Sequence, residues 1–380
     1  MIYMDHHATT PVDPRVVRAM VPFFSEKFGN AASLNHRYGK EAHEAVQRAR
    51  AQIARLINAE PSEIIFTSGA TESNNLALKG AAGAAPDGKN HLLTLSTEHK
   101  SVLDPFKRLA LSGFEVTHLP VQKDGLVDVE ELKRAITPRT ILISILFAHN
   151  EIGVLQPIAE IGRIAREKGI LFHSDAAQAL GKVPIDVRKM NLDLLSMTAH
   201  KIYGPKGVGA LYARRGTLLA PQIDGGGHEG GMRSGTLNVP GIVGFGKACE
   251  ICRGRMKKES ARLLKLRNRL LVGLLKIPGM NVNGSLKHRL PNNLNVSFPG
   301  VESGELLKRL KNVALSSGSA CLSTSPEPSY VLKALGVSEN LRRSAVRFGL
   351  GRFNTEKEVD AVLRDIIKVL RRRKNGADAG

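Results

Sequence analysis

The chain contains few cysteines, no tryptophan and few aromatic residues of any kind. Cys249, Cys252 and Cys321 are the only cysteines among its 380 residues. Three thiols cannot form a disulfide framework for a chain of this length, so we expect a reducing compartment and a cytoplasmic location. Aromatic residues make up 4% of the chain, which leaves little material for a nucleic-acid site built on base stacking.

Long apolar runs are also absent. No stretch reaches the roughly 18 consecutive apolar residues that a membrane-spanning helix needs. The opening Met-Ile-Tyr-Met-Asp is not a basic segment followed by an apolar run, so we expect no secretory signal. Hydrophobic residues at 42% and charged residues at 24% are close to the averages of globular proteins, which argues against disorder.

Acidic residues are scarce in one part of the chain only. The whole chain carries a net charge of +20, which by itself suggests a nucleic-acid or anionic-membrane partner. Residues 1–250 hold 29 basic and 25 acidic side chains, whereas residues 251–380 hold 26 basic and 10 acidic ones. The charge excess therefore belongs to the second part of the chain.

Apolar runs alternate with amphipathic stretches through the first 250 residues, a pattern typical of an α/β domain with a largely parallel sheet. After residue 250 a long basic helix is predicted from Cys249 to Leu275, followed by a mixture of short strands and helices. We therefore predict a large α/β domain at 15–250 and a smaller α+β domain formed by 1–14 and 251–380. The predicted strands begin at Glu63, Leu92, Ile141, Ile170, Leu194, Asn293 and Ala345.

Two charged residues lie at the ends of predicted strands. Lys201 follows an apolar strand and precedes a turn rich in Gly and Pro, which is where a Schiff-base lysine would need to be. Asp175 closes the preceding strand, and pyridoxal phosphate needs such a carboxylate at its pyridine nitrogen. The alternatives are a solvated surface lysine for Lys201, and a buried salt bridge or helix N-cap for Asp175.

Three further segments are candidates for function. The strand, glycine turn and helix start around Ser68 and Thr71 would present backbone N–H groups to an anion, although hydroxyl N-caps are common. The glycine-dense segment 224–236 would allow close approach of a ligand or partner, or is a surface loop. A cysteine is usually a small buried hydrophobe, but Cys321 lies among serines, glycine and prolines, a composition that favours an exposed loop. An exposed lone thiol is a candidate nucleophile. We attribute Cys249 and Cys252 to helix packing.

Seven motifs follow one another along the chain: Thr67-Ser-Gly-Ala-Thr-Glu-Ser-Asn-Asn, Thr97-Glu-His-Lys, Asn150-Glu-Ile-Gly, Asp175-Ala-Ala-Gln, Ala199-His-Lys-Ile-Tyr-Gly-Pro-Lys-Gly, Arg233-Ser-Gly-Thr and Ser316-Ser-Gly-Ser-Ala-Cys. They resemble, in the same order, motifs of cysteine desulfurases of the NifS/IscS type, which are pyridoxal-phosphate enzymes of the class V aminotransferase group. The resemblance covers nearly the whole chain and implies fold type I: a large domain with a mostly parallel seven-stranded sheet, and a smaller α+β domain.

The resemblance implies a role for each matching residue. Lys201 would hold the cofactor and move the substrate proton, and Cys321 would accept the sulfur. His99 would stack on the cofactor ring and assist proton transfer. The remaining cofactor contacts would be Ala70, Thr71, Asn150, Asp175, Gln178, Thr198, His200 and, from a second subunit, Thr236; the substrate carboxylate would be bound by Asn150 and Arg347.

The implied reaction converts L-cysteine to L-alanine and passes sulfur to Cys321 as a persulfide. The implied partners are a second copy of the chain and an iron–sulfur scaffold or tRNA-thiolating acceptor; no metal is expected, except that Cys321 would ligate a cluster if a scaffold docked. We hypothesise that the basic second domain steers an acidic acceptor. The alternatives are a selenocysteine lyase, a related aminotransferase, and a nucleic-acid binder. His228, Gly230 and Pro326 depart from the family pattern, which leaves partner choice and turnover open.

Overall fold

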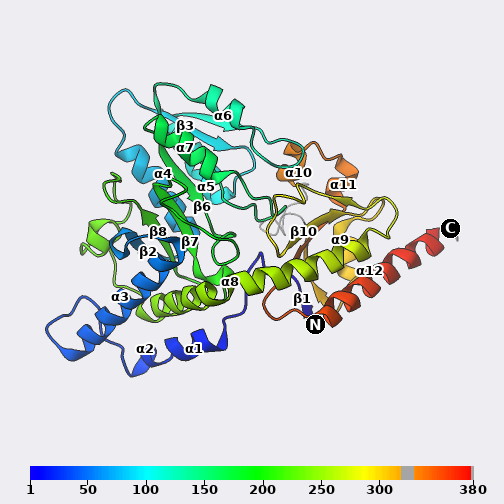
Figure 1. The fold of residues 1–380 in the computed structure, drawn as a ribbon, viewed down its shortest axis with the longest axis horizontal. Helices are drawn as coiled ribbons and strands as arrows, with labels where there is room; N and C mark the ends of the chain where they lie inside the picture. The colour runs from blue at the N-terminus through cyan, green and yellow to red at the C-terminus, as the bar shows by residue number, and fades with distance from the viewer. Residues whose placement is uncertain (318–328, 378–380) are drawn as a thin grey trace.

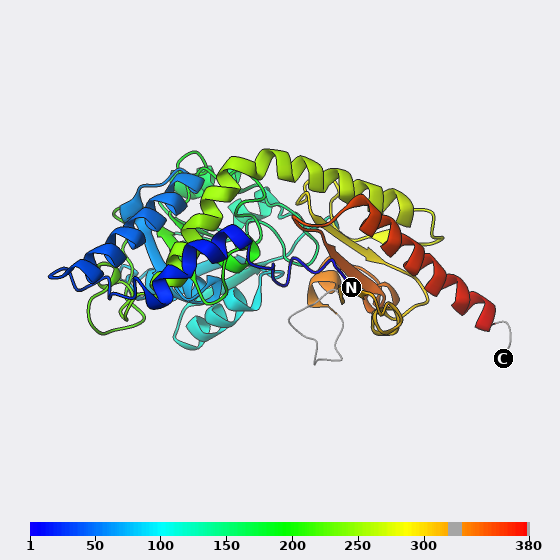
Figure 2. The same ribbon diagram turned by 90° about the horizontal axis from the view of Figure 1, so that it is seen from below.

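The protein has two lobes that are joined by one long helix. A computed structural model describes residues 1–317 and 329–377, and side chains as far as Arg371. Helix α8 (Val239–Leu274) runs along both lobes, and α12 (Glu356–Ala377) lies beside its C-terminal part (Figures 1 and 2). Within the described residues, no helix combines the length and the apolar character needed to cross a bilayer.

The large lobe is built on a seven-stranded sheet with the order β2-β8-β7-β6-β5-β3-β4. Adjacent strands from β7 to β4 pair in parallel, whereas β8 is antiparallel to both of its neighbours. The predicted fold class, with a mostly parallel seven-stranded sheet, is therefore confirmed. The strands are β2 (Ile64–Thr67), β3 (His91–Leu95), β4 (Glu115–Leu119), β5 (Thr140–Ser144), β6 (Leu171–Asp175), β7 (Leu194–Thr198) and β8 (Gly209–Ala213).

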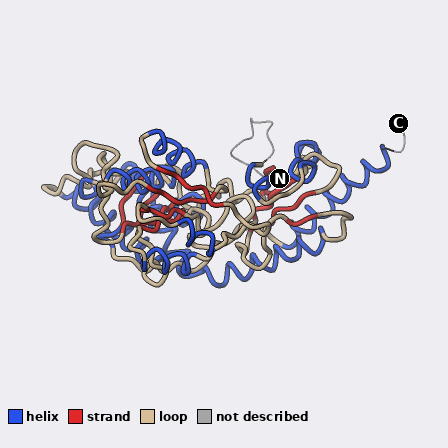
Figure 3. Tube along the Cα trace, turned by 90° about the horizontal axis from the view of Figure 1, so that it is seen from above, coloured by secondary structure: helices blue, strands red, loops and turns tan. Residues whose placement is uncertain are grey.

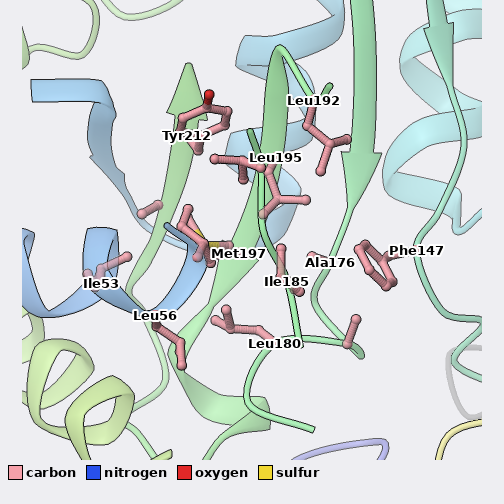
Figure 4. Packing of buried hydrophobic residues seen from close by; sticks show 14 of the residues in the cluster. Ile53, Leu56, Phe147, Ala176, Leu180, Ile185, Leu192, Leu195, Met197 and Tyr212 are labelled. Atoms are coloured by element: carbon pink, nitrogen blue, oxygen red, sulfur yellow. The ribbon is translucent and has the colours of Figure 1, made fainter. Parts of the chain in front are cut away.

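Apolar side chains cover both faces of this sheet because successive residues of a strand point to opposite sides. On one face, Leu195 and Met197 of β7 pack with Ile53 of α3 (Figure 4). On the other face, Leu194 packs in a cluster with α4 and α5. Helices therefore lie on both sides of the sheet: α1 (Pro14–Met20), α2 (Pro22–Ser25), α3 (Arg37–Ile57), α4 (Ala70–Gly83), α5 (Lys100–Leu111), α6 (Val129–Ala135) and α7 (Ile158–Glu167).

The small lobe contains an antiparallel sheet with the order β12-β13-β10-β9 and a separate parallel pair, β1 with β11. Figure 3 shows these strands as a group apart from those of the large lobe. The N-terminal strand thus belongs to the small lobe. The elements are β1 (Ile2–Tyr3), β9 (Asn281–Val282), β10 (Asn293–Ser297), β11 (Val313–Ala314), β12 (Ser316–Ser317), β13 (Ala345–Gly349), α9 (Ser303–Arg309), α10 (Tyr330–Ala334) and α11 (Glu339–Arg343).

Helix α8 contributes side chains to the hydrophobic cores of both lobes. Its residues up to Cys252 pack in the core of the large lobe, and its residues from Leu263 onward pack in the core of the small lobe. The predicted helix from Cys249 to Leu275 is therefore the C-terminal part of a helix that begins at Val239. The domain boundary at residue 250 stays a prediction, and the change of core between Cys252 and Leu263 supports a division nearby.

Candidate active site

A cavity of about 510 Å³ lies at the carboxyl ends of the sheet strands. Ligands gather at this edge in open α/β sheets because the strand ends and the following turns leave a crevice there. Thr236 is exposed and is not part of the lining, and Cys321 lies outside the described residues. The other predicted site residues all line the cavity: Ala70, Thr71, His99, Asn150, Asp175, Gln178, Thr198, His200, Lys201 and Arg347.

Lys201 reaches the cavity from a short 3₁₀ helix (Ala199–Lys201) that directly follows β7. Its Nζ donates hydrogen bonds to the backbone carbonyl oxygens of His7 and Ala8, both at 2.6 Å. The N-terminal segment therefore passes beside the lysine and holds its amine. The pairing of β6 with β7 places Asp175 opposite Ser196, so Asp175 and Lys201 emerge from adjacent strands at the same edge.

Asp175 is fixed by two hydrogen bonds and lies next to a chain of polar groups. Its carboxylate accepts from the backbone N–H of Ala177 and from Nδ2 of Asn74, both at 2.8 Å. Asn74 Nδ2 also donates to Ser101 Oγ at 2.8 Å, and Ser101 Oγ lies 2.8 Å from His99 Nδ1. Because a carboxylate only accepts, Asn74 must present its amino group here. These hydrogen-bonded side chains thereby connect the Asp175 carboxylate to the ring of His99.

His99 is held by its own helix as well. It is the N-cap of α5, and its Nδ1 accepts from the backbone N–H of Ser101 at 3.2 Å. The preceding residue, Glu98, is fully buried, and its Oε1 accepts from the backbone N–H of Leu146 at 2.7 Å. Burial, and then the nearby charge of Asp175, raise the pKa of Glu98 well above its ordinary value. Burial therefore favours the protonated form of Glu98.

The end of the cavity near α4 is suited to an anion. Helix α4 begins after Gly69 without a side-chain cap, so its first N–H groups and its dipole favour negative charge. A Cβ at Gly69 would meet only Thr198 Oγ1, at 4.0 Å, which leaves room for close approach. Lys206 also lines this cavity. Burial, and then the charges of Lys201 and Lys206, lower the pKa of His200 to about 4.

The opposite end contains a buried arginine. The Arg347 side chain is 1% exposed. It donates to the Asn150 carbonyl oxygen at 3.0 Å, to Asp5 Oδ1 at 2.8 Å and to Ser316 Oγ at 3.3 Å. Its Nε has no hydrogen-bond partner among the described residues. A planar guanidinium with donors left over is suited to a carboxylate.

The glycine-dense segment is fixed to the large lobe by two ion pairs. Arg233 pairs with Glu72 of α4 at 2.8 Å, and Glu229 pairs with Arg50 of α3 at 2.6 Å. Glu229 adopts a left-handed backbone conformation with φ 53°. Thr236 follows this segment on the surface, so in one copy of the chain its side chain does not enter the cavity.

The two cysteines of α8 have no part in the cavity. Cys249 and Cys252 are 0% and 4% exposed. Burial raises the pKa of both thiols, that of Cys252 to about 11. Their position agrees with the interpretation that they pack the helix. Among the described residues, no three His, Cys, Asp or Glu side chains gather as a metal site.

Several residues at the site were not predicted. Asn74 and Ser101 support Asp175 and His99, and both lie in or beside motifs that were recognised. Asn74 is four residues after Ala70, so it lies on the same helical face one turn later, and this spacing could have identified it. His7, Ala8 and Lys206 also line the cavity. No local signal marks His7, because its partners are distant in sequence.

Comparisons with known proteins agree on one family. The family model described as aminotransferase class-V matches residues 2–362. Cysteine desulfurase IscS of Anaeromyxobacter sp. (strain K) is 58% identical over 366 residues, which cover 96% of this chain and 91% of that protein. A solved structure of a NifS-like protein has a TM-score of 0.92 and 40% identity, and the match covers 97% of this chain and 99% of the other. A structure described as SspA in complex with cysteine has a TM-score of 0.82 and 39% identity, over 93% of this chain and 100% of its own.

Proposed function

Because this chain belongs to the class V aminotransferase family and its curated relatives at 53–58% identity are cysteine desulfurases, we propose that it converts L-cysteine to L-alanine and passes the sulfur to its own Cys321. The observation that carries the proposal is the single cavity that joins Lys201, Asp175, the α4 N-terminus and Arg347. These are an amine, a carboxylate, an anion site and a carboxylate-binding cation.

The residues present fit pyridoxal 5′-phosphate, the cofactor of this family. The α4 N-terminus, with the open space at Gly69, would hold the phosphate, together with Ala70, Thr71, Thr198 and His200. The turn before α4 also packs closely against Gly209, because a Cβ there would lie 2.6 Å from the Cα of Gly69. Asp175 would pair with the ring nitrogen, Gln178 would donate to the ring oxygen, and His99 would lie against the ring face. When bound, the cofactor supplies an electron sink for the electron pair of the substrate α-carbon.

The protein groups then divide the remaining tasks. Arg347 and Asn150 bind the substrate carboxylate and so orient the α-proton toward Lys201. The Lys201 amine would hold the cofactor and would move that proton. The carbonyl oxygens of His7 and Ala8 accept hydrogen bonds from this amine. Burial favours the protonated form of Glu98, and Asp175 is a carboxylate of the cavity lining itself.

The sulfur step balances without an external oxidant. The Cys321 thiolate forms a bond to the substrate sulfur, and the substrate C–S bond breaks with its electron pair left on carbon. Protonation of that carbon gives the methyl group of alanine, and the enzyme keeps a persulfide. A reductant or an acceptor thiol then removes the outer sulfur. Cys321 lies outside the described residues, so its role rests on the resemblance of the segment Ser316-Ser-Gly-Ser-Ala-Cys.

A dimer is part of the proposal. Thr236 is exposed, at the end of a segment that Arg233 and Glu229 tie to α4 and α3. We propose that this segment places Thr236 at the phosphate site of a second copy of the chain. A reducing, cytoplasmic compartment suits a chain whose nucleophile has to remain a thiol.

The acceptor is proposed to dock on the basic small domain. Residues 251–290 carry eleven basic side chains and one acidic one, Glu259. An acceptor with an acidic surface, such as an iron–sulfur scaffold or a tRNA-thiolating protein, would be attracted to this charge. L-Cysteine is the substrate, and we propose no direct binding of nucleic acid.

The test is a comparison of two cysteine variants. The purified protein with cofactor, L-cysteine and a reductant should form alanine and sulfide in equal amounts. Cys321→Ser should abolish sulfide formation, whereas Cys252→Ser should leave it within a factor of two of the parent, because the Cys252 thiol is buried. Full sulfide formation by Cys321→Ser would contradict the assignment of the nucleophile.

A further inference from the structure

His7 is a buried residue of the cavity wall whose side chain has no task in the proposed reaction. Its side chain is 1% exposed, and the residue lines the cavity. Its carbonyl oxygen accepts from Lys201 Nζ at 2.6 Å and from Gln178 Nε2 at 3.0 Å. Its ring Nδ1 lies 2.9 Å from Gln178 Oε1. One residue therefore contacts both the cofactor lysine and the proposed ligand of the ring oxygen.

These contacts determine which ring nitrogen carries the proton. The bond to the His7 carbonyl requires the amino group of Gln178 on that side, so Oε1 is the atom that faces the ring. Oε1 can only accept, hence Nδ1 of His7 carries the proton and donates. Nε2 has no hydrogen-bond partner among the described residues.

The ring is neutral at physiological pH. Burial is the largest cause that lowers the pKa of His7 well below its ordinary value. The positive charges of Lys182, Arg347 and Lys201, which face the ring from neighbouring segments, act in the same direction, and the hydrogen bond to Gln178 opposes them. A neutral ring keeps a single donor, and that donor is directed at Gln178.

Gln178 is consequently held at both ends of its amide. Oε1 accepts from His7 Nδ1 and, at 3.3 Å, from Lys182 Nζ, while Nε2 donates one of its two hydrogens to the His7 carbonyl. An amide fixed in this way cannot exchange its oxygen and nitrogen without loss of these bonds. The second N–H of Gln178 remains for a ligand in the cavity.

We propose that His7 is a positioning residue that fixes the Gln178 amide with its N–H toward the cavity, where it donates to the ring oxygen of the cofactor. This inference rests on the proposed function. With the cofactor bound, this hydrogen bond would draw charge from the ring oxygen and would weaken the attraction of that oxygen for a proton on the Lys201 nitrogen. His7 thereby sets the pH at which that proton is lost.

The experiment compares equal substitutions at two adjacent histidines. His6 is 3% exposed, and its Nδ1 lies 2.9 Å from the Gly349 carbonyl oxygen, so it is similarly buried and bonded. In the described part of the chain, the side-chain hydrogen bonds of Gln178 are to His7 and Lys182 and not to His6. His7→Ala removes the N–H that donates to Gln178. His7→Gln places its own N–H at a different position, and it provides the same test if the alanine variant fails to fold. His7→Asn keeps an N–H near the place of Nδ1. His6→Ala and His6→Gln are the controls.

The readout is the pH midpoint of the visible absorbance change of the bound cofactor without substrate, measured with the melting temperature. We expect His7→Ala and His7→Gln to raise the midpoint by about 0.5–1 pH unit, the equivalent of one hydrogen bond. His7→Asn should restore the midpoint of the parent. His6→Ala and His6→Gln should lower the melting temperature without moving the midpoint.

Gln178→Leu gives a second, independent test. It should raise the midpoint as His7→Ala does, and the double variant should show no further shift, because both act through one bond. An unchanged midpoint in the His7 variants, an equal shift in the His6 variants, failure of His7→Asn to restore it, or additive shifts would each overturn the proposal. Absence of a titrating absorbance band in the parent, or its persistence in Lys201→Ala, would instead contradict the proposed function.

Discussion

Charged side chains are buried and hydrogen-bonded in the cavity at the sheet edge, whereas those on the outer face of α8 are exposed. In the cavity, Asp175 and Arg347 are buried, and each makes at least two hydrogen bonds to other described residues. On α8, Arg253, Arg255 and Lys258 are exposed. The ion pairs that this helix forms among the described residues involve other residues of the helix, namely Lys247, Glu250, Glu259 and Arg269.

This difference separates the chemistry from the choice of partner. A buried charge is costly unless its neighbours compensate it, so the groups of the cavity are arranged for one ligand geometry. Exposed charges contribute little to stability but act over about 8–10 Å in physiological salt, which suits the capture of a large partner. Changes in the cavity should therefore alter the reaction, and changes on α8 should alter delivery of sulfur.

Loss of the cofactor lysine should have the largest effect. We expect Lys201→Ala to reduce alanine formation on the order of 10⁴-fold, because it removes the group that holds the cofactor and moves the proton. Alanine formation from L-cysteine measures this effect. Lys206→Ala is the matched control at the same cavity, and it should weaken cofactor binding while turnover at saturating cofactor stays within about tenfold. Equal losses in both variants would contradict the role of Lys201.

Two buried aspartates at opposite ends of the sheet give the next test. Asp175 and Asp193 are both 8% exposed, but Asp175 ends β6 at the cavity whereas Asp193 precedes β7 and pairs with Arg214 at 3.1 Å. We expect Asp175→Asn to lower kcat about 10²–10³-fold, because a neutral amide no longer stabilises a protonated ring nitrogen. Asp193→Asn should lower the melting temperature and leave kcat unchanged. Similar kcat values for the two variants would show that burial, and not position, determines the effect.

Asp13 is the N-cap of α1 in the large lobe, and its ion pair with Arg352 of the small lobe should respond to acid. Asp13 accepts from Arg15 and from Arg352 Nη1, both at 2.7 Å, and the bond from Arg15 is the largest cause that holds the pKa of Asp13 well below its ordinary 3.8. A carboxylate with a lowered pKa stabilises the fold above its ordinary pKa and loses this contribution as the pH falls toward the lowered value. We expect Asp13→Asn to reduce the free energy of unfolding by about 2 kcal/mol at pH 7.

Urea unfolding across pH measures this contribution. The difference in the free energy of unfolding between Asp13→Asn and the parent should be constant in the neutral range. It should become smaller below pH 3.8, the ordinary pKa of the carboxyl. Asp87→Asn is the control, because Asp87 lies exposed in a loop of the large lobe, and it should match the parent throughout. A difference that persists unchanged in acid would show that the charge of Asp13 does not stabilise the contact.

The sequence was sufficient to predict that Lys201 and Asp175 meet at the sheet edge. Lys201 and Asp175 each follow a buried apolar run, and parallel strands bring their carboxyl ends to one edge whatever their separation along the chain. The same runs predicted β2, β3, β5, β6 and β7. Strand β4 was missed because it is partly exposed and lacks a continuous apolar run, and β8 because it follows a turn rich in Gly and Pro.

Contacts between distant segments could not be predicted. The bonds of Asp5 to Arg347 and of His7 to Gln178 join residues 342 and 171 positions apart. The start of α8 was missed because glycines disfavour a helix by about 1 kcal/mol each when exposed. At Gly246 a Cβ would lie 2.5 Å from the Cα of Ala49 in α3. Close packing of α8 against α3 thus requires glycine at position 246. The same glycine weakens the helical pattern from which the start of α8 could have been predicted.

The smallest expected effect concerns the basic face of α8. The double variant Arg255→Glu, Lys258→Glu should slow transfer of sulfur to an acidic acceptor protein roughly 5-fold at low salt, because it reverses charge at the proposed encounter surface. The difference should disappear at high salt. With a small thiol reductant in place of the acceptor, alanine formation should equal that of the parent, since neither residue lines the cavity.

The same change of charge on the large lobe tests whether position matters. Lys168 and Lys189 are exposed there, and their replacement by glutamate alters the net charge equally. If the net charge of the whole protein attracted the acceptor, both double variants would slow transfer alike. If the local charge of residues 251–380 attracts the acceptor, only the α8 variant should show a salt dependence of sulfur transfer that differs from that of the parent. The reason is that an exposed charge acts over about one Debye length and not across the molecule.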